Sequence, residues 1–142
     1  LRGLRSLKTR MDAHEAAGLR IANWLSERPE VCQVLHPALE QHPDHVIWKR
    51  DFTGSNGLFS VILNTVSPEG LKRFFDALEL FSMGFSWGGF ESLIIPCDPQ
   101  LKRSKGHWID QKVGPLLRIH VGLETVDDLI ADLRAGFEAM GE

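Results

Sequence analysis

Several residue types and patterns that would suggest a function are scarce in this sequence of 142 residues. Only two cysteines occur, Cys32 and Cys97, and their spacing is not that of a metal site. No hydrophobic run is long enough to cross a bilayer, and no charged segment followed by an apolar core marks a secretory signal near the start. We therefore expect no membrane contact and a reducing, cytoplasmic location.

Positive charge is not in excess either. Lysine and arginine together number 16, against 19 aspartates and glutamates, and the formal net charge is −3. Without a cationic surface the protein has no long-range attraction for a phosphate backbone, so we do not expect general nucleic-acid binding. The 43% hydrophobic and 25% charged content is typical of a globular protein, and the length suits one domain.

The first long pattern is an apolar stripe that recurs every three or four residues from Leu4 to Leu25 and indicates an amphipathic helix. Pro29 disfavours helical geometry at Arg28 and ends this pattern. No capping residue precedes the stripe, so we expect the helix to begin upstream of Leu1 and the chain to belong to a longer protein.

Two predicted strands flank a long connection. Alternation of apolar and polar residues predicts a strand at 31–35, and a nearly continuous apolar run predicts another at 58–63. Between them, the segment 36–57 has turn-forming residues at both ends and two aromatic residues, Trp48 and Phe52, in its middle. We expect a long ordered loop there.

The second half of the chain supplies the remaining elements. They are, in order, a helix that starts at Ser67 and Pro68, a short strand at 80–83, a strand at 92–95, a strand at 116–121, and a final helix opened by Thr125 and Asp128. This order predicts an α+β fold of two layers, with a small, mostly antiparallel sheet, helices packed on one side, and a long N-terminal helix before it. Such folds serve many functions, so function must be argued from particular residues.

The segment 84–88 fits the G-x-S-x-G pattern of a serine hydrolase, in which a strained turn from strand to helix exposes a nucleophilic serine. The candidate triad is Ser86, with His107 or His120 as the base and Asp98 or Asp110 as the group that orients it. The context is unfavourable, because these hydrolases need several parallel strands before the turn and a helix directly after it, where this chain has a pair of glycines. Short motifs often match by coincidence.

Arg118 lies within the strongly apolar strand predicted at 116–121. Alternation places it on one face with Leu116 and His120, opposite Leu117 and Ile119. In one interpretation Arg118 occupies the solvent side of a half-buried strand. In the other it is a carboxylate receptor, because a guanidinium donates two parallel hydrogen bonds to a carboxylate and stays charged at any working pH.

Two further clusters have ordinary explanations. His42 and His45 lie three positions apart with Asp44 between them, and could in principle bind a metal together with His36 and Cys32. A structural metal site of this spacing normally has a second pair of ligands, so we interpret the histidines as solvated loop residues. A basic cluster with an aromatic neighbour, of a kind that can bind nucleic acid, consists of Lys102, Arg103 and Lys105 with His107 and Trp108. Three cations in one loop are usually a solvated turn rather than a nucleic-acid site.

Several segments, taken together and in order, resemble the carboxy-terminal domain of a known enzyme family. They are WKRDFTGSNGLFSVIL at 48–63, FSMGFSWGGFESL at 81–93, GPLLRIHVGLE at 114–124 and VDDLIADLRAGF at 126–137. The opening RGLRSLKTRM at 2–11 and RIANWL at 20–25 are similar to the helix that follows the cofactor domain in that family. The family is the Cys/Met-metabolism group of pyridoxal-phosphate enzymes of fold type I, and the resemblance is to its bacterial cystathionine β-lyases.

The residues that carry the family's pattern Ser-x-Gly-x-x-Glu-Ser and its arginine strand are Ser86, Gly88, Glu91, Ser92 and Arg118. Trp87 stands where members that act at the γ carbon usually have leucine, which favours the β-lyase branch. The resemblance implies that Arg118 binds the α-carboxylate of the substrate, helped by Ser86 and Trp87. The substrate would be L-cystathionine or a related thioether amino acid, cleaved to homocysteine, pyruvate and ammonia with pyridoxal 5'-phosphate as cofactor.

The resemblance also implies that residues 1–142 form the small C-terminal domain of a homotetrameric enzyme whose cofactor domain lies upstream. The Schiff-base lysine belongs to that upstream domain in the family, so we assign no catalytic residue or cofactor contact here and expect the isolated chain to be inactive. The chain has no tyrosine to stack on the cofactor ring, and Phe85 stands where close relatives often have tyrosine. We expect an exposed apolar face where the upstream domain packs. The alternatives are a serine hydrolase with Ser86 as nucleophile and a non-catalytic α+β interaction module.

Overall fold

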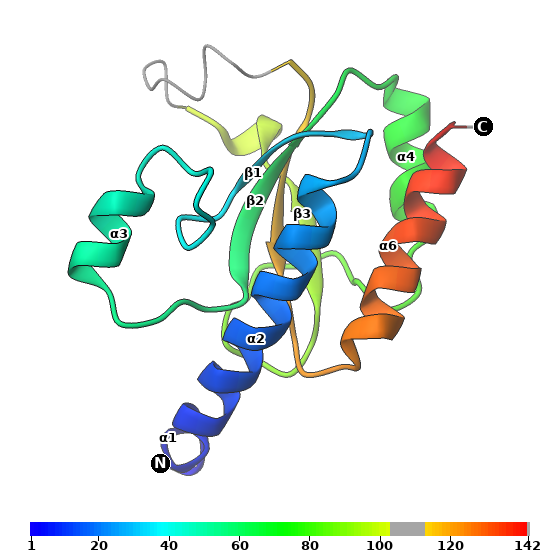
Figure 1. Cartoon of the computed structure of the whole chain (residues 1–142). Helices are drawn as coiled ribbons and strands as arrows, with labels where there is room; N and C mark the ends of the chain where they lie inside the picture. The colour runs from blue at the N-terminus through cyan, green and yellow to red at the C-terminus, as the bar shows by residue number, and fades with distance from the viewer. Residues whose placement is uncertain (103–112, 142) are drawn as a thin grey trace.

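The computed structural model describes residues 1–102 and 113–141 (Figure 1). Its helices and strands are, in chain order, α1 (Arg2–Arg5), α2 (Leu7–Ser26), β1 (Val31–Leu35), α3 (His45–Asp51), β2 (Leu58–Leu63), α4 (Pro68–Asp76), β3 (Leu93–Pro96), the 3-10 turn η1 (Asp98–Gln100), β4 (Leu116–His120) and α6 (Val126–Gly141). The predicted α+β class is confirmed.

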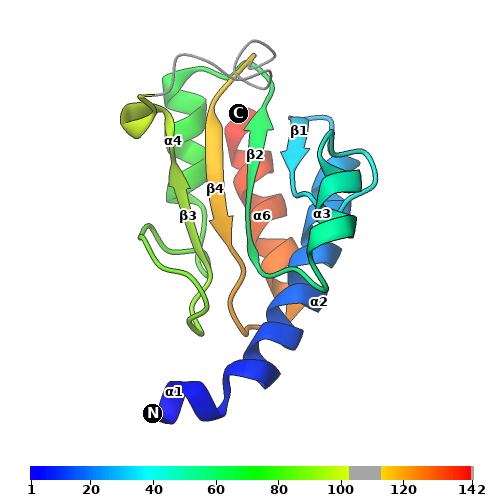
Figure 2. The same cartoon turned by 90° about the vertical axis from the view of Figure 1, so that its left-hand side faces the viewer.

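The strands that the structure describes form one sheet in the order β1-β2-β4-β3, and each neighbouring pair is antiparallel. Helices α4 and α6 lie against one face of this sheet, with α2 beside α6 (Figure 2). The predicted two-layer arrangement is therefore confirmed for the three long helices. The short helix α3 lies on the other side of the sheet, next to β1 and β2.

Alternation along the two central strands builds the core on the helix-covered face. Phe59 and Val61 of β2 lie opposite Ile119 and Leu117 of β4, and all four are buried. The helices complete this core with buried side chains that include Ile21 and Leu25 of α2, Phe74 of α4, and Leu129, Leu133 and Phe137 of α6. Burial of each large apolar side chain contributes about 1.5–3 kcal/mol, so this face provides most of the fold's stability.

The other face of the sheet carries the polar residues of interest. Here Arg118 of β4 lies between Ser60 of β2 and Ile95 of β3, and the next row places His120 between Leu58 and Leu93. The strand register thus confirms the prediction that Arg118 and His120 lie on the face opposite Leu117 and Ile119.

Three predicted elements differ from those observed. The segment 36–57 contains the helix α3, which sequence analysis missed because none of its residues is buried and it has no apolar stripe to detect. The predicted strand at 80–83 is only an isolated bridge between Ser82 and Leu93. The N-terminal stripe divides at Ser6 into α1 and α2, and its first leucines, Leu4 and Leu7, are exposed.

The prediction of solvated histidines between 36 and 45 is wrong for His36. This side chain is buried, and its ring centroid lies 5.4 Å from that of Phe59. Burial lowers the pKa of His36. His45 places Nδ1 3.0 Å from the carbonyl oxygen of Pro37. Within the described ranges no group of three or more potential metal ligands comes together.

No helix in the described part of the chain is long and apolar enough to cross a membrane. The basic cluster predicted as a solvated turn lies mostly outside the described residues, as do the candidate triad members His107 and Asp110. Both cysteines are free, Cys32 at an exposed position and Cys97 partly buried.

Candidate functional site

The structure brings Arg118 and Ser86 together, although they are far apart in the chain. Arg118 extends from the middle of β4, and its Nη2 donates a hydrogen bond of 2.9 Å to the carbonyl oxygen of Ser86. Together with Leu58, Phe85 and Trp87 these residues line a cavity of about 300 Å³. All three residues that sequence analysis selected, Arg118, Ser86 and Trp87, therefore face one cavity.

The guanidinium of Arg118 is partly buried and has no carboxylate partner among the described residues. Its neighbours across the sheet, Ser60 and Ile95, are uncharged. A half-buried cation without a counterion is unfavourable, and an anionic group that enters the cavity would relieve that cost. One Nη atom is held by Ser86, so Arg118 is oriented while other N–H groups remain for a ligand.

Residues 82–92 form an irregular loop that covers this part of the sheet. Gly88 is the only described residue with a positive φ, at 70°, and it allows the chain to turn directly after Trp87. Arg10 of α2 donates a hydrogen bond from Nη1 to the carbonyl oxygen of Gly88. The loop is therefore tied to β4 at Ser86 and to α2 at Gly88.

The same loop argues against the serine hydrolase. No helix begins among residues 82–92, so Ser86 does not lie on a turn from strand to helix. Neither ring nitrogen of His120 hydrogen bonds to Ser86 in the described part of the chain, so His120 is not placed to act as its base. Asp98 instead accepts a hydrogen bond of 2.9 Å from the backbone N–H of Leu116. Of the proposed triad, the described members do not come together.

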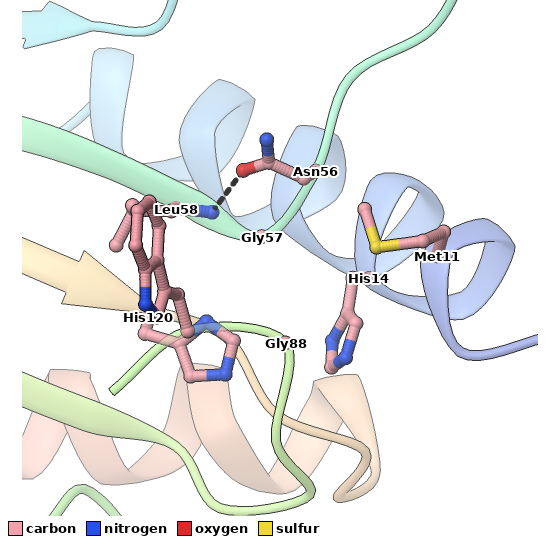
Figure 3. Close-up of a pocket in the computed structure, with 8 residues that line it drawn as sticks. Met11, His14, Asn56, Gly57, Leu58, Gly88 and His120 are labelled. Atoms are coloured by element: carbon pink, nitrogen blue, oxygen red, sulfur yellow. Dashed lines mark hydrogen bonds between the residues drawn. The ribbon is translucent and has the colours of Figure 1, made fainter. Parts of the chain in front are cut away.

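A second cavity, of about 210 Å³, adjoins the first and shares Leu58 and Trp87 with it (Figure 3). Its remaining lining comes from Met11, His14, Asn56, Gly57, Gly88 and His120. The rings of His14 and His120 lie 5.3 Å apart, and both residues are almost completely buried. This histidine pair thus lies beside the arginine site, two positions along β4.

In this pair, one hydrogen bond shows which ring nitrogen of His14 carries a hydrogen. Nδ1 of His14 lies 2.8 Å from the carbonyl oxygen of Val121, and because a carbonyl only accepts, Nδ1 carries the proton. Nε2 of His14 has no partner among the described residues. Burial lowers the pKa of His120, and the nearby His14 and Arg118 lower it further, which favours a neutral ring.

Sequence analysis did not single out His14, although a signal was present. His14 falls three residues after Met11 and three before Ala17, on the apolar stripe of the helix, so its burial follows from periodicity. Its pairing with His120 could not be read from spacing, because 106 positions separate them and only the packing of α2 against the end of β4 joins them.

The residues around these cavities do not fit pyridoxal phosphate by themselves. The cofactor needs a lysine for its Schiff base, and none of the residues that line either cavity is a lysine. Lys8 and Lys72 of the described part form ion pairs with Asp12 and Asp76 on exposed helix surfaces. Among the described residues, these cavities therefore offer an arginine whose fork could pair with an anionic group, and no lysine that could hold the cofactor.

Comparison with known proteins identifies what the chain resembles. Residues 1–138 match the family described as Cys/Met metabolism PLP-dependent enzyme. The cystathionine beta-lyase of Salmonella typhimurium is 51% identical over 138 residues, which cover 96% of this chain and 35% of that protein. Cystathionine beta-lyase MetC of Escherichia coli is also 51% identical, over 140 residues, with the same coverage.

A solved structure agrees with these matches. Cystathionine gamma synthase from Xanthomonas oryzae in complex with cystathionine superposes with a TM-score of 0.86 at 31% identity, over 99% of this chain and 37% of that one. The chain thus spans about a third of the length of the curated relatives it matches.

Proposed function

The chain belongs to the family of Cys/Met metabolism PLP-dependent enzymes, and from this premise we propose that it supplies the part of a carbon–sulfur β-lyase that binds the substrate α-carboxylate. The observation that carries this proposal is the half-buried guanidinium of Arg118, which faces a cavity and has no carboxylate partner among the described residues. Ser86 and Trp87 form the wall of that cavity.

Arg118 would bind the carboxylate through two roughly parallel N–H donors, with the Ser86 carbonyl holding the guanidinium in place from one side. A carboxylate fixed in this way limits the orientations of the substrate's Cα bonds, which is a positioning contribution to catalysis. Pyridoxal phosphate supplies the electron sink for the reaction in this family. Because the described residues that line the two cavities include no lysine, we propose that a cofactor domain outside residues 1–142 holds it, and that the isolated chain is inactive.

We propose L-cystathionine, or a related thioether amino acid, as the substrate. Two curated relatives at 51% identity are named cystathionine beta-lyase, and the related gamma synthase was solved with cystathionine. The overall reaction would consume water and yield homocysteine, pyruvate and ammonia. The exposed ring of Trp87 offers apolar area for the carbon–sulfur chain of such a substrate. A homo-oligomeric, cytoplasmic enzyme would fit this reading.

The experiment uses the complete enzyme that contains this domain, with Arg118 changed to Lys or Ala. We expect KM for L-cystathionine to rise about tenfold for Arg118→Lys and about a hundredfold or more for Arg118→Ala, because lysine keeps the charge but loses the paired donors. The absorbance of the bound cofactor should stay unchanged in both variants. Pyruvate release and the cofactor spectrum are the two measurements.

The matched control is Arg134→Ala on α6, where the arginine is exposed. It should leave KM and the cofactor spectrum as they are. Loss of the cofactor on Arg118→Ala, or an unchanged KM, would contradict a role in carboxylate binding. The hydrolase and interaction-module alternatives gain no support, since the family match covers nearly the whole chain.

A further inference from the structure

We propose that Glu124 is a positioning residue for this site, because it anchors the far end of the 82–92 loop so that Ser86 stays against Arg118. The inference rests on the proposed function and extends it to a residue that touches neither substrate nor cofactor. Glu124 lies four residues after the end of β4, and it acts through Ser92, the last residue of the loop.

The contact between Glu124 and Ser92 uses both carboxylate oxygens. Oε1 accepts the backbone N–H of Ser92 at 2.8 Å, and Oε2 accepts its hydroxyl at 2.8 Å. The same hydroxyl oxygen accepts the backbone N–H of Gly122, also at 2.8 Å. Ser92 is completely buried, so each of these groups would lose a partner that water could not replace.

The neighbouring backbone leaves little room for adjustment. The N–H of Leu123 donates to the carbonyl oxygen of Phe90 at 2.9 Å. A Cβ atom at Gly122 would lie only 2.3 Å from that same oxygen, so only glycine permits the loop to lie this close to the chain after β4. The segment 118–124 therefore contacts the loop at three points, through Ser86, Phe90 and Ser92.

Hydrogen bonds are the main restraint on the middle of this loop. Its large apolar side chains, Met83, Phe85, Trp87 and Phe90, are between 61% and 75% exposed, so burial does little to hold them. At the other end, the buried carboxylate of Asp132 accepts three backbone N–H groups, from residues 79–81. Two carboxylates thus anchor the chain on either side of Ser86.

The consequence concerns Arg118. If Glu124 no longer holds Ser92, the loop gains freedom and the Ser86 carbonyl ceases to orient the guanidinium. Arg118 then has more side-chain conformations to lose when a carboxylate binds. Substrate binding should weaken, while the chemical step after binding, which depends on groups elsewhere, should change little.

The test compares Glu124→Gln and Ser92→Ala in the complete, cofactor-loaded enzyme. We expect KM for L-cystathionine to rise about fivefold to twentyfold in each, with kcat within about threefold and an unchanged cofactor spectrum. Both variants alter the hydrogen bond between the Ser92 hydroxyl and the Glu124 carboxylate. The KM of the double variant should therefore exceed that of the more impaired single variant by no more than about twofold. The matched control is Glu40→Gln, an exposed glutamate between β1 and α3, which should leave KM unchanged.

A variant that destabilises the opposite face of the sheet distinguishes a positioning role of Glu124 from a merely structural one. Phe137→Leu in the core should lower the unfolding temperature without moving KM. The inference is overturned if Glu124→Gln and Ser92→Ala leave KM unchanged, as Phe137→Leu does, while Arg118→Lys still raises KM. A lower unfolding temperature in these two variants would then show that the contact is only structural. If Arg118→Lys also has no effect on KM, the proposed function falls together with the inference.

Discussion

The two faces of the sheet are held by different forces. On the helix-covered face, side chains such as Val61, Leu117 and Phe74 are buried in one continuous apolar cluster. On the other face, Arg118 and the 82–92 loop are held by directional hydrogen bonds, and the loop's aromatic side chains remain exposed. The first face therefore supplies most of the stability of the fold, and the second carries the candidate functional site.

The strongest test of this comparison removes a large side chain from the core face. Phe74 is completely buried and its ring packs at 5.2 Å from Phe137, so Phe74→Ala should cost about 3–5 kcal/mol of unfolding free energy. Phe85→Ala, at an exposed position on the other face, should cost within about 0.5 kcal/mol. Urea unfolding measures the loss of unfolding free energy in both variants. Equal losses would contradict the idea that the two faces are held by different forces.

A smaller effect is expected where a polar anchor is altered. Asp132 accepts hydrogen bonds from the backbone N–H groups of Glu79, Leu80 and Phe81, and asparagine would turn an N–H group toward one of these donors. We expect Asp132→Asn to cost about 1–3 kcal/mol. Glu40→Gln, at an exposed position outside the helices, serves as the control for the loss of charge. A cost as large as that of Phe74→Ala would mean that the polar anchors dominate stability after all.

The smallest effect is a dependence of stability on pH. Burial lowers the pKa of His36 and of His120 in the folded protein below the ordinary value of 6.5. As pH falls below 6.5, the unfolded chain takes up protons that the folded chain does not, so stability decreases with decreasing pH. The slope approaches about 1.4 kcal/mol per pH unit for each histidine until its folded pKa is reached.

Urea unfolding curves recorded between about pH 5 and 8, the range in which histidine side chains change charge, measure this slope. His120→Gln should remove the contribution of His120 to the slope of stability against pH. His36→Gln should remove the share of the other buried histidine. A stability that rises as the pH falls through this window would contradict the expected sign.

The sequence predicted some parts of this structure better than others. Strands β2 and β4 and helix α4 were found because alternation, apolar continuity and the Ser67–Pro68 cap are local signals. Helix α3 was missed because it buries no residue and so leaves no periodic pattern. The strand predicted at 80–83 shrank to one bridge, because the backbone groups of residues 79–81 hydrogen bond to Asp132 instead of to a neighbouring strand.

The candidate site shows the same division. Spacing alone left Arg118 as either a solvent-facing residue or a carboxylate receptor, and the resemblance to a family favoured the second. Its partner Ser86 was named from the motif, but the anchoring roles of Glu124 and Asp132 and the pairing of His14 with His120 had no sequence signal. Each of these contacts joins segments more than thirty residues apart.

The sequence by itself determined the order of the three long helices and the four strands that the structure describes, and it carried the motifs of the family. It could do so because periodicity and local motifs act over a few residues. The tertiary structure decided that one cation faces a cavity with its orientation fixed by a distant carbonyl, and that two buried imidazoles share a neighbouring cavity. Such arrangements depend on the register of the strands and the packing of α2 and α6, which bring together groups whose separation along the chain carries no information about their distance in space.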